Sequence, residues 1–368
     1  MWGINKGLKQ MEVSMKSLVS NNVLGGIAAC AIAATITGAE AKVWKLTAAS
    51  SHPPIVPWVA VIKNHVVPQS NIRLKEIGSP DSIKWTQAYA GALYNFNNTL
   101  EGVQDGLTDI GWVGTLWEPV KMPLHNVTFY APFTSATVHQ LVDIQEEMET
   151  TIPAMKKEWD KHNQVYLGGQ AADTYHIVST FPINSMADLK GKKFMAPGAV
   201  AGWLKGTGAI GINGGLPVYY NNMKTGVADG AIIITTGMLP FKLHEAAPYI
   251  TKVDMGGPIS GALTMNKDTW KKLPAHMKIL FRDLGRDYAR MQSDVIAKKE
   301  ALFLKIMAKQ GATISEFSPS ERKKWVNSLP NLAGDWAKAN GAAGKKVLSA
   351  FMNGVRKRGG KPTRDWDK

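Results

Sequence analysis

The residues that could do chemistry in this sequence do not stand in the patterns that catalysis requires. Residues 206–211 (GTGAIG) match the glycine pattern of a dinucleotide-binding loop, but no strand precedes them and no helix follows to hold a pyrophosphate. The serine in residues 257–261 (GPISG) is displaced by one position from a nucleophile elbow. His244-Glu245 begins like a zinc-binding helix, but Pro248 stands where the second histidine is needed.

Metal and cofactor chemistry find no better support. The eight histidines lack the close spacing of a metal-binding cluster, and the single cysteine, Cys30, excludes an internal disulfide and a cysteine-ligated zinc or iron–sulfur site. We therefore expect no cofactor, no metal and no catalytic residue. The sequence favours a protein that binds a molecule without changing it.

Length and composition indicate a folded protein of about two domains. The chain has 368 residues, of which 45% are hydrophobic and 20% charged, and domains usually take about 100–200 residues each. The formal net charge is +14, and part of it lies in a basic tail, residues 356–368, which we expect to be solvated. We expect no nucleic-acid partner, because the N-terminus indicates export.

Residues 1–41 are typical of a secretory signal peptide. Lys16 precedes an apolar stretch, residues 23–36, and small residues (AEA) stand directly before Lys42. The apolar stretch is shorter than the roughly 20 residues that span a bilayer. We expect cleavage before Lys42 and a periplasmic location. Two alternatives are an uncleaved N-terminal anchor and lipidation of Cys30.

Strands and helices alternate along the rest of the chain, which indicates open, mostly parallel sheets with helices on both faces. The expected strands are residues 43–49, 71–78, 108–113, 127–130, 165–168, 175–180, 193–195, 230–235 and 312–317. The expected helices are residues 55–67, 82–103, 139–162, 199–205, 218–225 and 275–310. An exported α/β protein without catalytic motifs favours a periplasmic binding protein, in which two domains close on a ligand.

The segment 275–310 is predicted to be one long helix. It contains almost no helix breaker, and its apolar residues keep helical spacing. A helix of about 35 residues is roughly 50 Å long at 1.5 Å per residue, which exceeds the width of one domain. We therefore expect it to run across two domains.

Four segments, in order, resemble motifs of the solute-binding proteins of TRAP (tripartite ATP-independent periplasmic) transporters, the DctP-like family. They are residues 99–111 (TLEGVQDGLTDIG), 183–193 (INSMADLKGKK), 218–230 (VYYNNMKTGVADG) and 265–274 (MNKDTWKKLP). The resemblance covers residues 43–340. It implies two α/β domains of the periplasmic binding protein fold, a hinge of crossing strands, and a long helix spanning both domains. It also implies a pair of membrane subunits that take the ligand and use an ion gradient.

On this basis we assign residues 42–170 plus 261–300 to domain I, and residues 171–260 plus 301–368 to domain II. The predicted function is the solute-binding subunit of a TRAP transporter, which captures a small organic ligand in the interdomain cleft. A periplasmic ligand sensor for a membrane receptor is the alternative within the same fold. An exported α/β hydrolase is a remote alternative.

The sequence departs from the family at three positions that the resemblance implies are ligand contacts. Met195 stands where most family members have an arginine that binds the ligand carboxylate with two hydrogen bonds. Tyr175 stands where many have a second arginine, and Ile233 stands where the family usually has an asparagine. A buried carboxylate without its partner costs several kcal/mol. We therefore expect a ligand other than a simple C4-dicarboxylate.

Aromatic residues are predicted to complete the site. Trp112 and Trp117 lie at the C-terminal end of the third expected strand, where such sheets bind ligands. Tyr94 and Asn97 are candidates from the preceding segment, and Trp203 follows the strand that holds the family's arginine position.

Three ligand classes fit these residues. The first is a neutral or aromatic molecule stacked on tryptophan and tyrosine. The second is a cation held by aromatic faces. The third is an atypical carboxylate held by His52, His176 or Lys205.

Overall fold

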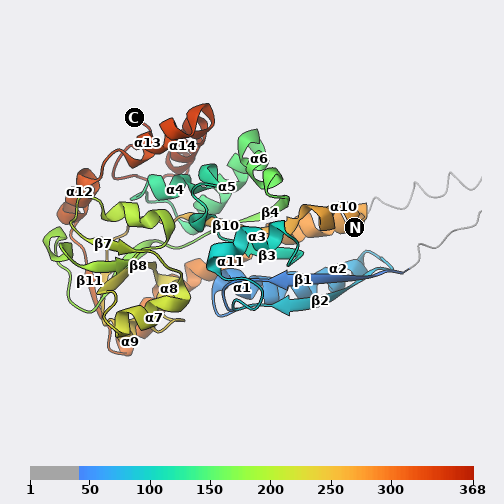
Figure 1. The fold of residues 1–368 in the computed structure, drawn as a ribbon, viewed down its shortest axis with the longest axis horizontal. Helices are drawn as coiled ribbons and strands as arrows, with labels where there is room; N and C mark the ends of the chain where they lie inside the picture. Colours follow the sequence, from blue (N-terminus) through green and yellow to red (C-terminus); the bar gives the residue numbers. More distant parts are fainter. Residues whose placement is uncertain (1–40) are drawn as a thin grey trace, which may run out of the picture. The chain divides into compact units, whose positions relative to one another are not determined.

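The structure, a computed structural model, describes residues 41–368. The predicted signal peptide and the alternative of lipidation at Cys30 lie outside the described residues. Two β-sheets with helices packed around them make up the described chain (Figure 1). None of the helices within residues 41–368 is both long enough and apolar enough to cross a membrane.

The first sheet has five strands in the order β2-β1-β3-β10-β4. The strands are β1 (Val43–Ala49), β2 (Ser82–Ala88), β3 (Ile110–Val113), β4 (Gln164–Ala171) and β10 (Ile259–Asn266). β1 pairs in parallel with both β2 and β3, whereas β10 runs antiparallel to β3 and β4. The carboxyl ends of β1 and β3 therefore meet at one edge of the sheet.

The second sheet has six strands in the order β11-β9-β5-β8-β6-β7. The strands are β5 (Tyr175–Ser179), β6 (Lys193–Met195), β7 (Ile210–Ile212), β8 (Gly230–Ile234), β9 (Tyr249–Lys252) and β11 (Thr313–Glu316). β5 is antiparallel to both of its neighbours, β8 and β9. Every residue of β5 and β8 is buried, as expected for central strands with apolar side chains on both faces.

Both sheets are mostly parallel, as expected, with one reversed strand in each: β10 in the first and β5 in the second. The reason lies in two connections between the sheets. The chain passes from β4 to β5 and returns from β9 to β10, so these strands run in opposite directions. The two connections lie side by side. The backbone N–H of Ala172 donates to Pro258 at 2.9 Å, and that of Met255 donates to Tyr175 at 3.1 Å. The crossing strands expected of the fold are therefore present as a hydrogen-bonded pair.

One long helix, α11 (Ala275–Lys309), contacts elements of both sheets. It packs on β4 beside the first sheet and on α8 and β11 beside the second. Gly285 makes the close approach possible, because a Cβ there would overlap the backbone of Leu167. The predicted α/β fold with a helix spanning both parts is confirmed.

The other helices cover the faces and ends of the sheets (Figure 1). They are α1 (Pro57–Val61), α2 (Val67–Glu76), α3 (Thr99–Gln104), α4 (Val127–Tyr130), α5 (Val138–Thr151), α6 (Pro153–Lys161), α7 (Leu216–Lys224), α8 (Thr235–Met238), α9 (Leu243–Ala246), α10 (Lys267–Lys272), α12 (Pro319–Ser328), α13 (Leu332–Ala339) and α14 (Gly341–Lys357). A π-helical turn, Ile62–Val66, joins α1 to α2, and short 3₁₀ turns include Phe96–Asn98, Thr115–Trp117 and Gly198–Leu204.

Several predicted elements were wrong. Residues 71–78 lie mostly in α2 rather than in a strand, and the predicted helix 82–103 begins instead as β2. Residues 127–130 form the short helix α4 and not a strand. The predicted helix 139–162 breaks at Pro153, because proline begins a new helix there as its first residue.

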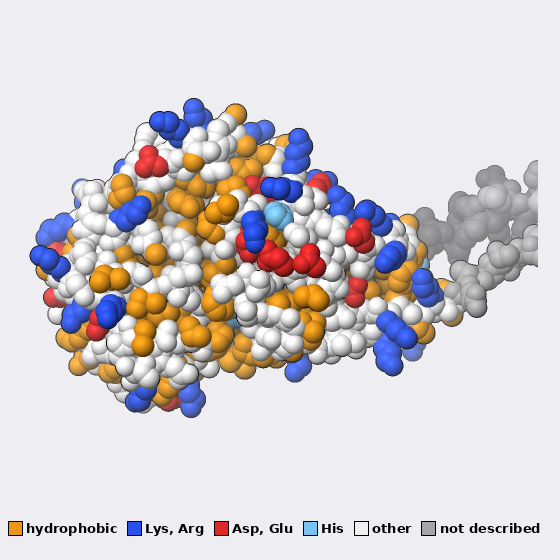
Figure 2. Space-filling model, viewed as in Figure 1, with side chains coloured by type: hydrophobic (Ala, Val, Ile, Leu, Met, Phe, Trp, Pro, Cys, Tyr) orange, Lys and Arg blue, Asp and Glu red, His pale blue; other side chains and the backbone are white. Residues whose placement is uncertain are grey.

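The lysines of the basic tail, Lys357, Lys361 and Lys368, are exposed as expected of a solvated tail, but other residues of the tail are anchored on the protein. Arg356 forms ion pairs with Asp365 and Asp367 at 2.6 and 2.5 Å. The buried indole of Trp366 donates to the carbonyl of Pro132 at 2.6 Å. Lysine and arginine side chains on the face drawn in Figure 2 stand in separate groups with acidic side chains among them.

The C-terminal helices pack across the first part of the chain. α13 contacts α4, α14 contacts α4 and α5, and the indole of Trp336 donates to the carbonyl of Pro123 at 3.2 Å. Residues 301–368 therefore contact elements that the sequence assigned to domain I. The predicted domain boundaries stay a prediction.

Candidate ligand-binding site

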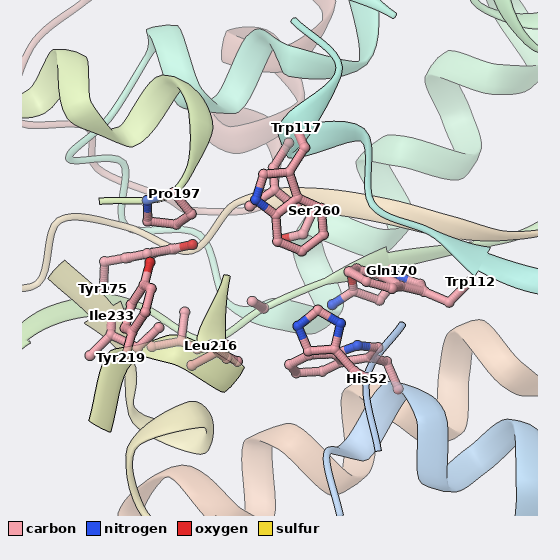
Figure 3. A pocket seen from close by; sticks show the side chains of 14 residues that line it. His52, Trp112, Trp117, Gln170, Tyr175, Pro197, Leu216, Tyr219, Ile233 and Ser260 are labelled. Atoms are coloured by element: carbon pink, nitrogen blue, oxygen red, sulfur yellow. The ribbon is translucent and has the colours of Figure 1, made fainter. Parts of the chain in front are cut away.

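A cavity of about 40 Å³ lies where side chains of the two sheets meet (Figure 3). Elements of the first sheet and its loops contribute His52, Trp58, Trp112, Leu116, Trp117, Gln170 and Ser260. Elements of the second contribute Tyr175, Pro197, Leu216, Tyr219, Ile233 and Ile234, and Ala172 comes from the connection between the sheets. We call these fourteen residues the pocket.

An aromatic cluster forms the first-sheet half of the pocket. The imidazole of His52 is stacked on Trp117 with ring centroids 5.6 Å apart. It meets Trp112 edge to face at 5.3 Å and Trp58 at 6.0 Å. His52 follows β1, and Trp112 and Trp117 lie in and after β3, so the carboxyl edge of parallel strands brings them together. Such aromatic pairs contribute about 0.5–1.5 kcal/mol each beyond their burial.

His52 is uncharged at neutral pH. Its side chain is buried, and burial lowers its pKa to about 4. The hydroxyl of Ser51 lies 3.0 Å from Nδ1 of His52. Within the described residues, Nε2 of His52 makes no hydrogen bond. The imidazole therefore offers one nitrogen to an occupant of the pocket, without a positive charge.

The indole nitrogens of the pocket fall into two groups. Nε1 of Trp112 donates to the side-chain carbonyl of Gln170 at 3.2 Å, and the amide of Gln170 donates to the backbone of Ala171 at 2.8 Å. Nε1 of Trp58 and of Trp117 are buried and have no acceptor in the described part of the chain. A buried donor without a partner costs about 1–3 kcal/mol. Two residues of the pocket therefore carry indole donors that lack an acceptor within the described residues.

The second-sheet half of the pocket is mainly apolar. Tyr175 on β5 and Ile233 on β8 come from adjacent antiparallel strands. The hydroxyl of Tyr219 is already engaged, because it donates to the carbonyl of Gly214 at 3.2 Å. Burial, with a smaller effect of Asp173, raises the pKa of Tyr175 and keeps its hydroxyl protonated. That hydroxyl makes no hydrogen bond within residues 41–368 and lies beside the cavity in Figure 3.

Four of the predicted site residues line the pocket: Tyr175, Trp112, Trp117 and Ile233. Two others are buried and are not among the lining residues. Trp203 packs edge-on against Tyr175 at 5.3 Å and donates its indole N–H to the carbonyl of Phe129 at 2.6 Å. Met195 is fully buried, and its sulfur lies 3.5 Å from the side-chain nitrogen of Asn222.

The remaining predicted residues lie farther from the lining. Nδ1 of His176 accepts from the backbone N–H of Asp254 at 3.2 Å, beside the connection between the sheets. Tyr94 is buried with its ring against Gly102, and Asn97 is exposed in a 3₁₀ turn. Their role as ligand contacts stays a prediction.

The sequence reasoning did not single out the lining residues Trp58, Leu116, Gln170, Ala172, Pro197, Leu216, Tyr219, Ile234 and Ser260. Tyr219 belongs to the family-like segment 218–230, which shortly precedes the predicted contact Ile233. Its place in that segment could have marked it as a candidate lining residue. Trp58 is the second residue of α1, the helix that follows β1. Because parallel sheets bind ligands at that edge, its position carried a weaker signal.

No lysine, arginine, aspartate or glutamate is among the residues that line this cavity. Lys205, one of the cations considered for a carboxylate, is exposed and outside the lining. Of the three candidate partners for a carboxylate, only His52 reaches the pocket, and it is neutral.

Residues 78–340 match the family model described as bacterial extracellular solute-binding protein, family 7, also called DctP. The match covers more than half of the chain. The chain belongs to this family. The predicted membership of the DctP-like solute-binding proteins of TRAP transporters is thereby confirmed. Members of the family are extracytoplasmic solute receptors and not enzymes, so the hydrolase alternative is rejected.

Solved structures share the fold of this DctP-family chain. A Bordetella pertussis extracytoplasmic solute receptor binding pyroglutamic acid aligns with TM-score 0.70 at 21% identity, covering 84% of this chain and 99% of its own. A marine metagenome TRAP protein specific for aromatic acids, in complex with metahydroxyphenylacetate, aligns with TM-score 0.74 at 23% identity, covering 85% and 99%. A Rhodoferax ferrireducens TRAP protein with copurified benzoate aligns with TM-score 0.73 at 21% identity, covering 85% and 98%. At these identities the likeness shows the fold.

Proposed function

We propose that this protein is the solute-binding subunit of a TRAP transporter. It captures a small organic ligand in the pocket and delivers it to membrane subunits for uptake driven by an ion gradient. The observation that carries the proposal is the pocket itself. Its lining comes from both sheets, and most of it, including Trp112, Tyr175 and Tyr219, is buried.

Closure of the two sheets around a ligand follows from this burial. A molecule reaches buried side chains only if the two halves of the pocket separate. The connections β4–β5 and β9–β10 are held together by backbone hydrogen bonds close to Tyr175, and they provide the hinge. We infer that the two sheets belong to the two predicted domains and that α11 follows their movement.

The ligand differs from a simple C4-dicarboxylate in this proposal. Met195 stands at the position where the family's arginine is expected, and the lining residues carry no side-chain cation at neutral pH. A dicarboxylate in this pocket would leave two charges buried and unpaired, at a cost of several kcal/mol. Solved relatives bind pyroglutamic acid, aromatic acids and uronates, so the fold accommodates varied organic molecules.

Export belongs to the same proposal. Residues 1–41 act as the signal peptide, and the mature protein begins at Lys42 in the periplasm. The first strand, β1, begins at Val43, so cleavage at this point leaves the described fold whole.

A thermal-shift screen of the exported protein tests the function. The library contains dicarboxylates, sugar acids, aromatic acids, neutral aromatics and quaternary amines. A ligand at 100 times its Kd adds about 2.7 kcal/mol to the stability of the folded state, which raises Tm visibly. We expect at least one class to stabilise the protein.

A matched pair of variants locates the binding. Ile233→Phe adds bulk to the cavity and should abolish the shift, whereas Ile210→Phe makes the same change on β7, where Ile210 is half exposed. Equal shifts in both variants would place the ligand elsewhere. Uptake by vesicles containing the membrane subunits then separates transport from the alternative, a ligand sensor, which would bind without supporting uptake.

A further inference from the structure

Building on the proposed function, we infer that the pocket selects an uncharged ligand that carries a hydrogen-bond acceptor oxygen. The acceptor faces Trp117 and His52, and the apolar part of the ligand faces Ile233 and Leu216. The inference rests on three features of the pocket: the charges missing from its lining, the donors left without acceptors, and the division into a polar and an apolar half.

The lining residues disfavour charge of either sign. A carboxylate ligand would find no lysine or arginine there, and an ammonium ligand would find no aspartate or glutamate. Two buried carboxylates directly follow lining residues along the chain, and both are engaged elsewhere. Asp173 is held by the backbone N–H of Thr236 at 2.9 Å and by the hydroxyl of the same residue. Glu118 lies 3.4 Å from Nζ of Lys121. Burying an unpaired charge is far more costly than burying a neutral group that keeps its hydrogen bonds.

The unpaired donors call for an acceptor. Nε1 of Trp117 is buried and makes no hydrogen bond within the described chain. Figure 3 shows this nitrogen on the side of the indole that faces Pro197 and Tyr175, across the cavity. An N–H group directed at the occupant repels a cation and attracts a carbonyl, amide or hydroxyl oxygen. The aromatic cluster therefore differs from a cage for a quaternary amine, in which ring faces surround the charge.

His52 adds a second polar contact without adding charge. Its Nδ1 is taken by the hydroxyl of Ser51, which leaves Nε2 for the ligand. When the serine hydroxyl donates to Nδ1, the proton of the neutral imidazole resides on Nε2, which then donates to the same acceptor oxygen. Because burial lowers the pKa of His52 to about 4, this arrangement persists through the neutral range.

The other half of the pocket receives the apolar part of the ligand. Ile233, Leu216 and Pro197 have no side-chain hydrogen-bonding group, and the hydroxyl of Tyr219 is committed to the carbonyl of Gly214. Tyr175 is the one residue of this half with a free hydroxyl within the described chain. In Figure 3 the two halves face each other, with His52 and Gln170 on one side and Ile233 and Leu216 on the other.

Two series of nearly isosteric probes test the inference. Benzoate, benzamide and benzylamine differ in charge but share a ring, and isobutyrate, isobutyramide and isobutylamine repeat the comparison without a ring. Calorimetry at pH 7.4 should show at least one amide binding at least tenfold more tightly than its acid and its amine. Comparing the affinities of the two amides, benzamide and isobutyramide, shows whether the apolar half of the pocket binds a flat ring or a compact branched group.

A conservative variant tests the donor. Trp117→Phe keeps an aromatic ring but removes the N–H, and it should weaken binding of the amide about tenfold. Trp44→Phe is the matched control, because among residues 41–368 Nε1 of Trp44 also has no acceptor and is buried, but Trp44 lies on β1, outside the pocket. Equal loss in both variants, or no loss in Trp117→Phe, would overturn the assigned donor.

The outcomes separate this inference from the function on which it rests. Tight binding of an acid or an amine, with the matching amide weak or silent, overturns the inference and leaves the solute receptor standing. Failure of these six probes and of the whole thermal-shift library overturns both. An amide preference that disappears in Ile233→Phe supports both.

Discussion

Gly285, on α11, lies directly against Gly168, on β4. A Cβ added to Gly168 would overlap the backbone carbonyl of Gly285, and one added to Gly285 would overlap that of Leu167. The backbones of the helix and the strand therefore touch without a side chain between them. Because β4 leads into the connection to the second sheet, this contact holds the long helix close to that connection.

Gly285→Ala is predicted to destabilise the protein, although alanine is the better helix former by about 0.5–1 kcal/mol. The new methyl group has no room, and overpacking of this kind costs about 1–3 kcal/mol. Urea unfolding should show a lower free energy of unfolding. Gly202→Ala is the control, since a Cβ at Gly202 meets nothing within 4 Å. Equal stability of the two variants would contradict the close contact.

His125 is predicted to make stability depend on pH. It is buried, with Nε2 2.8 Å from Glu149 and Nδ1 2.8 Å from Glu158. Burial by itself would lower its pKa, but the two carboxylates outweigh burial and raise it from 6.5 to about 9. A histidine whose pKa is raised on folding stabilises the native state fully below pH 6.5, and this contribution is lost as pH rises through 9.

The difference between wild type and His125→Gln isolates this effect. Glutamine still forms hydrogen bonds but does not titrate. We expect the wild type's advantage to fall by about 3 kcal/mol between pH 6 and pH 10. Urea unfolding at pH 6, 8 and 10 measures it. A constant difference across the three values would show that folding does not shift the pKa of His125.

Met195→Arg restores the family's arginine at a buried position. Met195 is fully enclosed by the protein, so a guanidinium there is taken out of water, and we expect the free energy of unfolding to fall by about 2–4 kcal/mol. Benzoate should recover part of the loss, because its carboxylate pairs with the new charge. Thermal unfolding with and without benzoate provides the measurement.

Met195→Leu keeps the volume and the apolar character of the side chain, and it should unfold within about 1.5 kcal/mol of wild type. If Met195→Arg is as stable as Met195→Leu and gains nothing from benzoate, the new side chain points to solvent. The position would then have no access to the pocket.

Strong local patterns made much of the fold predictable. The 35-residue helix α11 follows from a long segment with regular apolar spacing. β8 was predictable because a short apolar run, which ends at Ile234, directly follows the turn residues Asp229 and Gly230. The prediction failed where a helix and a strand share one pattern. In residues 71–78 the apolar side chains alternate as in a strand, yet Leu74 is buried on a helix while Ile72 is exposed.

The site was predictable only in part, because the pocket is assembled from distant segments. Trp112 and Trp117 were found from their place at the end of a strand, and Tyr175 and Ile233 from family positions. No local pattern indicates that Leu216 and Ser260 face the same cavity, since tertiary packing decides it. Met195 was predicted to be a ligand contact from its sequence position. In the structure it is buried and is not among the lining residues, so this role stays a prediction.

The N-terminus of the exported protein gives the last prediction. The backbone nitrogen of Lys42 donates to the carboxylate of Asp81 at 3.1 Å, and the other oxygen of Asp81 lies 3.2 Å from Nε2 of His276. Cleavage before Lys42 turns this N–H into an ammonium group, and charge-assisted hydrogen bonds are stronger than neutral ones. We therefore expect intact-mass analysis to find a protein that begins at Lys42. Asp81→Asn should destabilise this form more than the uncleaved chain, by about 0.5 kcal/mol for so exposed a pair. A mature protein that begins elsewhere, or an equal effect on both forms, would remove Asp81 from this role.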